Sequence, residues 1–206
     1  MSLQETPASA ERPKPLIRGP IRADTMRLRT LTPVAALVAV AGFADPTPTS
    51  LALGLPTVLI GEAIRLWAAG YLHKTRELVT SGPYAHVRHP LYLGTLLIGV
   101  GLIVMAGAEV ALVGLPAGLV FFFAYYLPYK DQGEAERLER RFGDAFRAYR
   151  DTVPALRPRL RPWRDPARPR ARSWRPERLR DNSEISTALA VATATTLLVL
   201  AGGWLI

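Results

Sequence analysis

The sequence predicts an all-α membrane protein, a polytopic helical bundle of about five transmembrane helices with a cytoplasmic amphipathic helix. Hydrophobic residues make up 49% of the chain and occur in blocks, with the charged residues gathered between the blocks. Every Lys and Arg except Arg65 lies in three segments, 1–30, 73–89 and 129–184. A soluble domain would intersperse the two classes of residue, so this segregation indicates a membrane protein.

The first part of the chain is a polar, Pro-rich tail (1–30) that we expect to be disordered and cytoplasmic. It lacks the pattern of a signal peptide. The apolar run LTPVAALVAVAGFA at 31–44 is short for a membrane span unless the helix tilts or extends at its ends. The sequence DPTPT at 45–49 predicts a tight turn, because proline stops helices. A second span follows at 50–72.

The next two spans are predicted to form a hairpin. The third, 90–107, begins with Pro90, whose missing N–H costs nothing in the first helical turn. A minimal turn leads into the fourth, 109–128, which ends in FFFAYYLPY, an aromatic belt typical of a membrane interface. Residues 130–151 then read as an amphipathic helix. Its apolar stripe consists of Leu138, Phe142, Phe146 and Tyr149.

Together with the tail at 1–30, these elements divide the chain into four parts. Residues 31–154 form the predicted membrane core. The Arg/Pro-rich stretch 155–184 is predicted to be an extended cytoplasmic linker, since proline cannot continue a helix. Residues 185–206 form a C-terminal transmembrane helix. The Lys/Arg asymmetry predicts an integral protein of the plasma (inner) membrane, with the N-terminus and the active site in the cytoplasm.

The composition excludes several classes of partner. The formal charge of +9 is concentrated beside apolar runs, which favours contact with membrane lipid over binding of nucleic acid. With no cysteine and three histidines, no metal site is predicted. We therefore expect membrane lipid and a lipophilic small molecule as partners. No feature of the sequence specifies an oligomeric state.

The stretch GPYAHVRHPLYLG (82–94) gathers cationic and aromatic side chains at the mouth of the third span. Arg88 and His89 beside a helix start either anchor the helix at the membrane surface or form part of a binding site. Gly82-Pro83 forces a turn just upstream, and Gly94 leaves room for another helix or a ligand. From the residues alone, the two interpretations are about equally supported.

Two further groups of ionisable residues stand out. Glu134 heads the amphipathic helix on the same side of the membrane and shares a face with Leu138 and Arg141. Its spacing fits both a solvated face and a site. Glu62 and Arg65 lie three residues apart inside the second span. A mutual ion pair is the more frequent role for such residues, and a place in a groove for a lipid substrate is the other.

Two motifs together carry a family resemblance. GPYAHVRHPLYLG is similar to the G-P-Y-x-x-x-R-H-P-x-Y-x-G signature of the isoprenylcysteine carboxyl methyltransferase and phospholipid methyltransferase superfamily. EAERLERRFGDAFRAYRDTVPAL resembles the second element of that superfamily, in the expected order. This chain departs from the pattern at Ala135, where a second acid is frequent, and at Phe146, where a Tyr is frequent.

The resemblance implies an integral membrane enzyme that transfers a methyl group from S-adenosyl-L-methionine without a Rossmann domain. The sequence carries no glycine-rich fingerprint of such a domain. The acceptor would be lipophilic, an isoprenylcysteine-type carboxylate or a lipid headgroup. The resemblance implies that Arg88 binds the cofactor carboxylate and that Glu134 binds the ammonium or a ribose hydroxyl. It also implies that both residues are catalytic. The implied cofactor-binding residues are Tyr84, Arg88, His89, Pro90, Tyr92, Gly94 and Glu134.

Two other functions fit parts of the sequence. A nicotinamide-dependent membrane reductase of the sterol-reductase type shares a related His-Pro-x-Tyr helix start, but its motif generally reads Asn-Tyr where this chain has Leu91-Tyr92. A non-enzymatic membrane scaffold would use the Arg-rich linker to bind anionic lipid. The scaffold would bind no cofactor.

Overall fold

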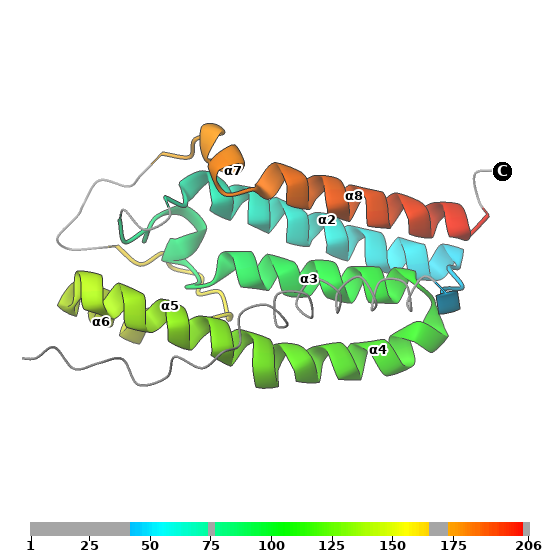
Figure 1. The fold of residues 1–206 in the computed structure, drawn as a ribbon, viewed down its shortest axis with the longest axis horizontal. Helices are drawn as coiled ribbons and strands as arrows, with labels where there is room; N and C mark the ends of the chain where they lie inside the picture. The colour runs from blue at the N-terminus through cyan, green and yellow to red at the C-terminus, as the bar shows by residue number, and fades with distance from the viewer. Residues whose placement is uncertain (1–41, 74–76, 165–172, 204–206) are drawn as a thin grey trace, which may run out of the picture. The chain divides into compact units, whose positions relative to one another are not determined.

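The computed structural model describes residues 42–73, 77–164 and 173–203, and all regular structure within these ranges is helical (Figure 1). The predicted tail and all but the end of the first apolar run lie outside the described residues. The helices are α2 (Pro48–Tyr71), α3 (Pro90–Met105), α4 (Ala108–Phe121), α5 (Leu127–Phe142), α6 (Asp144–Thr152), α7 (Glu177–Asp181) and α8 (Glu184–Ala201), with a 3-10 turn at Gly82–Ala85.

Within the described ranges, three helices are long and apolar enough to cross a membrane. They are Pro48–Tyr71, Glu184–Ala201 and the continuous helix Ala108–Phe142, which contains α4 and α5. Helix α3 is also apolar but only 16 residues long. These lengths agree with an integral membrane protein.

Helices α2 and α3 make the most extensive helix pair, and small residues bring their backbones together. A Cβ atom on Gly94 would lie 2.6 Å from the carbonyl oxygen of Gly61, and one on Gly61 would lie 2.7 Å from that of Gly94. Gly54 and Gly101 face the same crossing. Close approach through small residues is a common way for membrane helices to pack. This packing fixes α3 firmly against α2.

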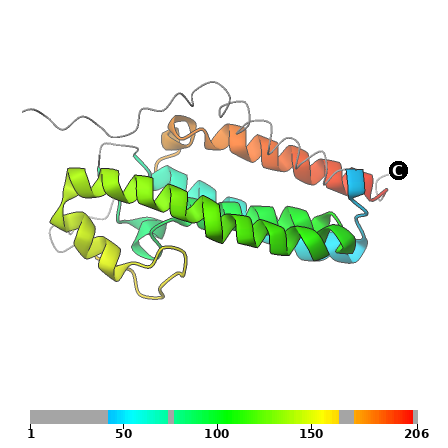
Figure 2. The same cartoon turned by 60° about the horizontal axis from the view of Figure 1, so that its bottom comes forward.

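The segments predicted as the fourth span and the amphipathic helix are continuous, and a π-helical stretch (Phe122–Tyr126) joins α4 to α5. The N–H of Leu127 bonds to the carbonyl of Phe122, five residues earlier. Pro128 follows directly and has no N–H to donate, so the wider turn accommodates it. Figures 1 and 2 show the resulting long helix running beside α3 and beyond its start.

The predicted amphipathic helix 130–151 is broken at Gly143, which adopts φ 52° and ψ −124°. Helix α6 then folds back, and ion pairs span the bend. Glu139 accepts from Arg147 at 2.7 Å and from Arg150 at 3.2 Å. The predicted apolar stripe survives this bend: its residues pack with Leu78, Val153 and Trp163.

The Arg/Pro-rich segment is not extended throughout, because residues 173–184 dock on the C-terminal end of α2 and include the short helix α7. The Asn182 side-chain amide donates to the carbonyls of Ala69 and Leu72, both at 3.0 Å. Trp174 Nε1 donates to the carbonyl of Leu66 at 3.3 Å. The last carbonyls of a helix have no partner within it, so the docked segment supplies donors that α2 lacks. Helix α8 then runs beside α2 (Figure 1).

The bend at Gly143 generates a stability prediction. Gly143→Ala should destabilise the protein by about 1–3 kcal/mol, because an L side chain is strained in this backbone conformation. Gly133→Ala in α5 is the matched control. A Cβ atom meets nothing within 4 Å at either position, and Gly133 has no positive φ. The control should be neutral or stabilise by up to about 1 kcal/mol. Thermal unfolding in detergent measures both, and equal shifts would contradict the strained conformation at Gly143.

Candidate functional site

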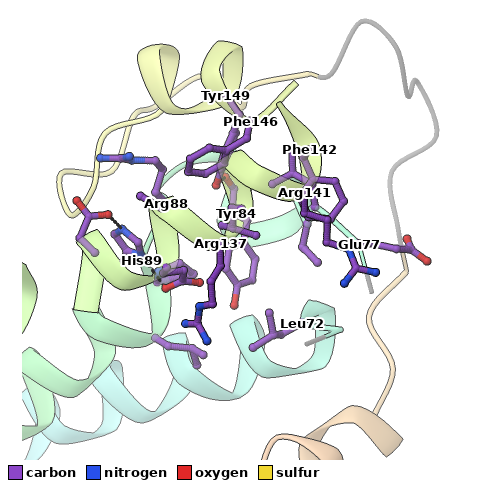
Figure 3. A pocket seen from close by; sticks show the side chains of 18 of the residues that line it. Leu72, Glu77, Tyr84, Arg88, His89, Arg137, Arg141, Phe142, Phe146 and Tyr149 are labelled. Atoms are coloured by element: carbon purple, nitrogen blue, oxygen red, sulfur yellow. Dashed lines mark hydrogen bonds and ion pairs between the residues drawn. The ribbon is translucent and has the colours of Figure 1, made fainter. Parts of the chain in front are cut away.

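A cavity of about 680 Å³ lies where residues 72–73 and 77–79, the 3-10 turn, the start of α3, and α5 and α6 converge. Figure 3 shows Arg88 and His89 on one side of it and Arg141 and Glu77 on the other. Its walls include Leu72, Leu78, Leu91, Leu138, Phe142 and Phe146, so polar groups are set in an apolar surface. This size and lining are typical of small-molecule sites.

Two hydrogen bonds join the start of α3 to α5 at this cavity. His89 Nε2 lies 2.7 Å from Asp131 Oδ1. The hydroxyl of Tyr92 donates to Glu134 Oε2 at 3.0 Å. The rings of His89 and Tyr92 are stacked, with centroids 5.0 Å apart. Asp131 and Glu134 are three residues apart and so lie on one face of α5. We call the contacts of His89 with Asp131 and of Tyr92 with Glu134 the ladder, and it fixes the orientation of both rings in the cavity wall.

The loop before α3 is held by the chain that follows α6. The N–H of Arg88 donates to the carbonyl of Pro154 at 2.8 Å, and that of His89 donates to Ala155 at 3.0 Å. The side-chain Nε of Arg88 is buried and has no hydrogen-bond partner among the described residues. An unsatisfied buried guanidinium N–H is costly, so this donor favours an anionic or carbonyl-bearing ligand.

Two buried tyrosines lie behind the loop. The hydroxyl of Tyr149 donates to the backbone carbonyl of Tyr84 at 2.8 Å, which ties α6 to the 3-10 turn. Burial raises the pKa of Tyr84 well above its usual range, and the nearby Glu134 carboxylate adds to the shift. Burial likewise raises the pKa of Tyr149. Both phenols are therefore neutral hydrogen-bonding groups, and neither serves as a base near neutral pH.

The structure brings most of the predicted site residues together. Those that line the cavity are Tyr84, Arg88, His89, Pro90, Tyr92 and Glu134. Gly94 is not among them. It lies at the crossing of α3 with α2, where the space beside it is occupied by Gly61 and the Arg65 side chain. A small residue at this position permits the close approach of either another helix or a ligand, and the structure shows close helix packing.

Of the two alternatives for Glu62 and Arg65, the mutual ion pair is not formed in the structure. Arg65 forms a bidentate ion pair with Glu184 of α8, at 2.8 and 2.9 Å. Both carboxylate oxygens of Glu62 are buried and have no hydrogen-bond partner among the described residues. The competing partner, Glu184, lies 119 residues along the chain, beyond the reach of spacing arguments. Neither Glu62 nor Arg65 lines the cavity.

Sequence reasoning missed several polar residues of the cavity, among them Asp131 and Arg137 of α5. Asp131 makes the shortest contact in the ladder, and it lies one helical turn before Glu134 on the predicted amphipathic helix. The three-residue spacing places Asp131 on the same helix face as Glu134, and this could have identified it from the sequence. Arg137 lies about one turn after Glu134 and also lines the cavity. Together with Arg141, it places cations toward the end of α5 that is farther from Asp131.

The site therefore offers cationic, acidic and apolar groups within one cavity. Such a lining suits a ligand that carries charges of both signs and an apolar or aromatic part. Among the described residues, no group of three or more His, Cys, Asp or Glu side chains is arranged to hold a metal ion.

Comparisons with known proteins point to one family. Residues 52–131 match the model of the isoprenylcysteine carboxyl methyltransferase (ICMT) family, which confirms the resemblance found in the first motif. Protein-S-isoprenylcysteine O-methyltransferase B of Arabidopsis thaliana is 33% identical over 114 residues, which are 50% of this chain and 56% of the relative. The match to the family model ends before Glu134 and the second motif.

Two bacterial relatives have names of another kind. The nickel-cobalt-cadmium resistance protein NccN of Alcaligenes xylosoxydans xylosoxydans is 38% identical over 112 residues, 53% of this chain and 50% of the relative. The cobalt-zinc-cadmium resistance protein CzcN of Cupriavidus metallidurans is 38% identical over 116 residues, 55% of this chain and 51% of the relative. The chain spans about half the length of the curated relatives it matches. No solved structure matches.

Proposed function

We propose that this chain, whose residues 52–131 match the isoprenylcysteine carboxyl methyltransferase family, is a membrane methyltransferase that transfers a methyl group from S-adenosylmethionine to the carboxylate of a lipophilic acceptor. One observation carries the proposal. Arg88, His89 and Tyr92 of the first motif and Glu134 of the second, which are distant in sequence, line a single cavity. A scaffold would have no need of this convergence.

The lining fits the charged end of S-adenosylmethionine. Arg88 has an unsatisfied buried N–H that suits a carboxylate, and charge-assisted hydrogen bonds of this kind are strong. The carboxylate of Glu134 suits the ammonium or a ribose hydroxyl. The leucines and Phe142 and Phe146 supply apolar surface for the rest of the molecule. These assignments of Arg88 and Glu134 are part of the proposal.

S-adenosylmethionine supplies a methyl group on a sulfonium, open to in-line attack by a nucleophile. The protein then has to align the acceptor with this methyl group and exclude water. An ionised carboxylate needs no base, because it has no proton to lose. The acid–base groups of the ladder are already engaged with one another, which agrees with a positioning role for them. No comparison supports the phospholipid N-methyltransferase branch of the sequence-based expectation.

The surroundings of the cavity suit a membrane enzyme with a cytoplasmic site. Its rim carries Arg137, Arg140 and Arg141, and the docked segment near α2 adds further arginines. At the opposite end of α3, the backbone N–H of Asp45 donates to the carbonyl of Ala106, and the described residues of this turn include no Lys or Arg. This asymmetry supports placing the cavity at the cytoplasmic face of the inner membrane. A lipophilic acceptor would then arrive laterally from the bilayer.

The cofactor assignment can be tested by binding. Isothermal titration of the detergent-purified chain with S-adenosylmethionine and S-adenosylhomocysteine should show specific binding. Arg88→Ala and Glu134→Gln should each weaken binding by about tenfold or more, because a charged hydrogen bond contributes about 1.5–3 kcal/mol. The matched control is Glu136→Gln on the same helix. The Glu136 side chain is 72% exposed and pairs with Arg140 at 3.9 Å, so binding should not change.

Three outcomes would redirect the proposal. Binding of a reduced nicotinamide in place of both sulfur compounds would favour the reductase. Binding of neither class would favour the scaffold. Equal losses in Glu134→Gln and Glu136→Gln would mean that α5 presents a different face to the ligand.

The acceptor class can be tested by the stability of the product. Reconstituted protein supplied with methyl-labelled S-adenosylmethionine and a farnesylated cysteine acid should form a product that releases its label as methanol in alkali, because esters hydrolyse there. The matched control replaces the acid with its amide, which has no carboxylate to methylate. Label that resists alkali and appears in membrane lipid would instead identify an amine acceptor.

A further inference from the structure

Arg65 links the C-terminal helix to the start of α3, and the proposed function makes no use of this link. From its place on α2, its Nη2 donates to both carboxylate oxygens of Glu184 on α8. Its Nη1 donates to Thr95 Oγ1 at 2.6 Å and to the carbonyl of Leu91 at 3.4 Å. A guanidinium is a planar fork of donors, so one side chain bridges three helices.

The two acceptors on α3 belong to the part of the helix that forms the cavity. Leu91 lines the cavity and lies between Pro90 and Tyr92. Thr95 Oγ1 also donates to the carbonyl of Leu91, at 2.9 Å, so the bonds from Arg65 act on a local network. The geometry of this turn sets the direction of the Tyr92 side chain toward Glu134.

We propose that Arg65 is a positioning residue for the S-adenosylmethionine site, and that Glu184 holds it in place. The C-terminal helix thereby completes a site to which it contributes no lining residue, although it lies outside residues 52–131. The inference rests on the proposed function, because it concerns how the same S-adenosylmethionine site is held in its geometry.

Burial makes this arrangement depend on Glu184. Glu184 is 3% exposed, and removing one partner of a buried ion pair leaves an uncompensated charge. A competing partner is at hand. Glu62 lies three residues before Arg65 on α2, and its buried carboxylate oxygens have no hydrogen-bond partner among the described residues. Without the charge of Glu184, the guanidinium turns toward Glu62 and away from Leu91 and Thr95.

Asn182 provides a matched control. It is buried, and its side chain ties the same C-terminal segment to α2 through the carbonyls of Ala69 and Leu72. Neither of these bonds reaches α3 or Arg65. Asn182→Ala should therefore loosen the docking of the C-terminal segment without releasing Arg65 from α3.

The experiment compares Glu184→Gln with Asn182→Ala in the full-length chain in detergent. Titration with S-adenosylhomocysteine should show about tenfold weaker binding for Glu184→Gln, since a residue that acts through another typically changes coupling by a few-fold to tens-fold. Asn182→Ala should bind within about twofold of the unmodified protein while unfolding at a lower temperature. Equal losses of affinity in both variants, or none in Glu184→Gln, would overturn the proposal.

A second readout separates this proposal from the proposed function. Hydrogen exchange of the amides at 93–95, measured without ligand, should quicken in Glu184→Gln and stay unchanged in Asn182→Ala. If the unmodified protein binds no sulfur compound, the function fails, and this exchange result still decides whether Glu184 and Arg65 set the start of α3. Should Glu184→Gln not fold, Thr95→Val takes its place in both assays. It keeps the ion pair and removes one acceptor of Arg65, and unchanged affinity and exchange would then overturn the proposal.

Discussion

The start of α3 is tied to α5 by the contacts of His89 with Asp131 and of Tyr92 with Glu134, and the cavity depends on this ladder. Because α3 is fixed against α2 by the glycine crossing, the ladder holds α5 at a set distance from the bundle. Apolar residues of α5 and α6, together with Leu72, Leu78 and Val79, then close the walls. The apolar cluster around Leu78 and Val153 also attaches α5 and α6 to the bundle, but the ladder makes the polar contacts between the two motifs.

Backbone features on either side support this arrangement. The π-helical stretch allows one continuous helix to carry Pro128 and to bring Asp131 and Glu134 opposite α3. The bend at Gly143 returns α6 over the cavity, where Tyr149 bonds to the turn before α3. The chain after α6 then bonds to the backbone of Arg88 and His89. The first motif is thus enclosed by elements that follow it by about forty residues or more.

The sequence predicted the helical fold and six residues that line the cavity, because hydrophobic blocks, Pro90 and the two motifs are local signals. It predicted the apolar stripe of α5 and α6 for the same reason. The break at Gly143 was missed, since a glycine within an amphipathic pattern is compatible with a continuous helix. The pairing of Arg65 with Glu184 was missed because a contact across 119 residues has no local signature. Gly94 shows a third limit, because a small residue indicates a close approach but does not distinguish a neighbouring helix from a ligand.

The central claim is that the two motifs bind one ligand between them. An experimental structure of the full chain with S-adenosylhomocysteine tests it most directly. We predict density for the ligand in the cavity of about 680 Å³, in contact with Arg88 on one side and Glu134 on the other. Ligand bound elsewhere, or in contact with one motif alone, would contradict the account.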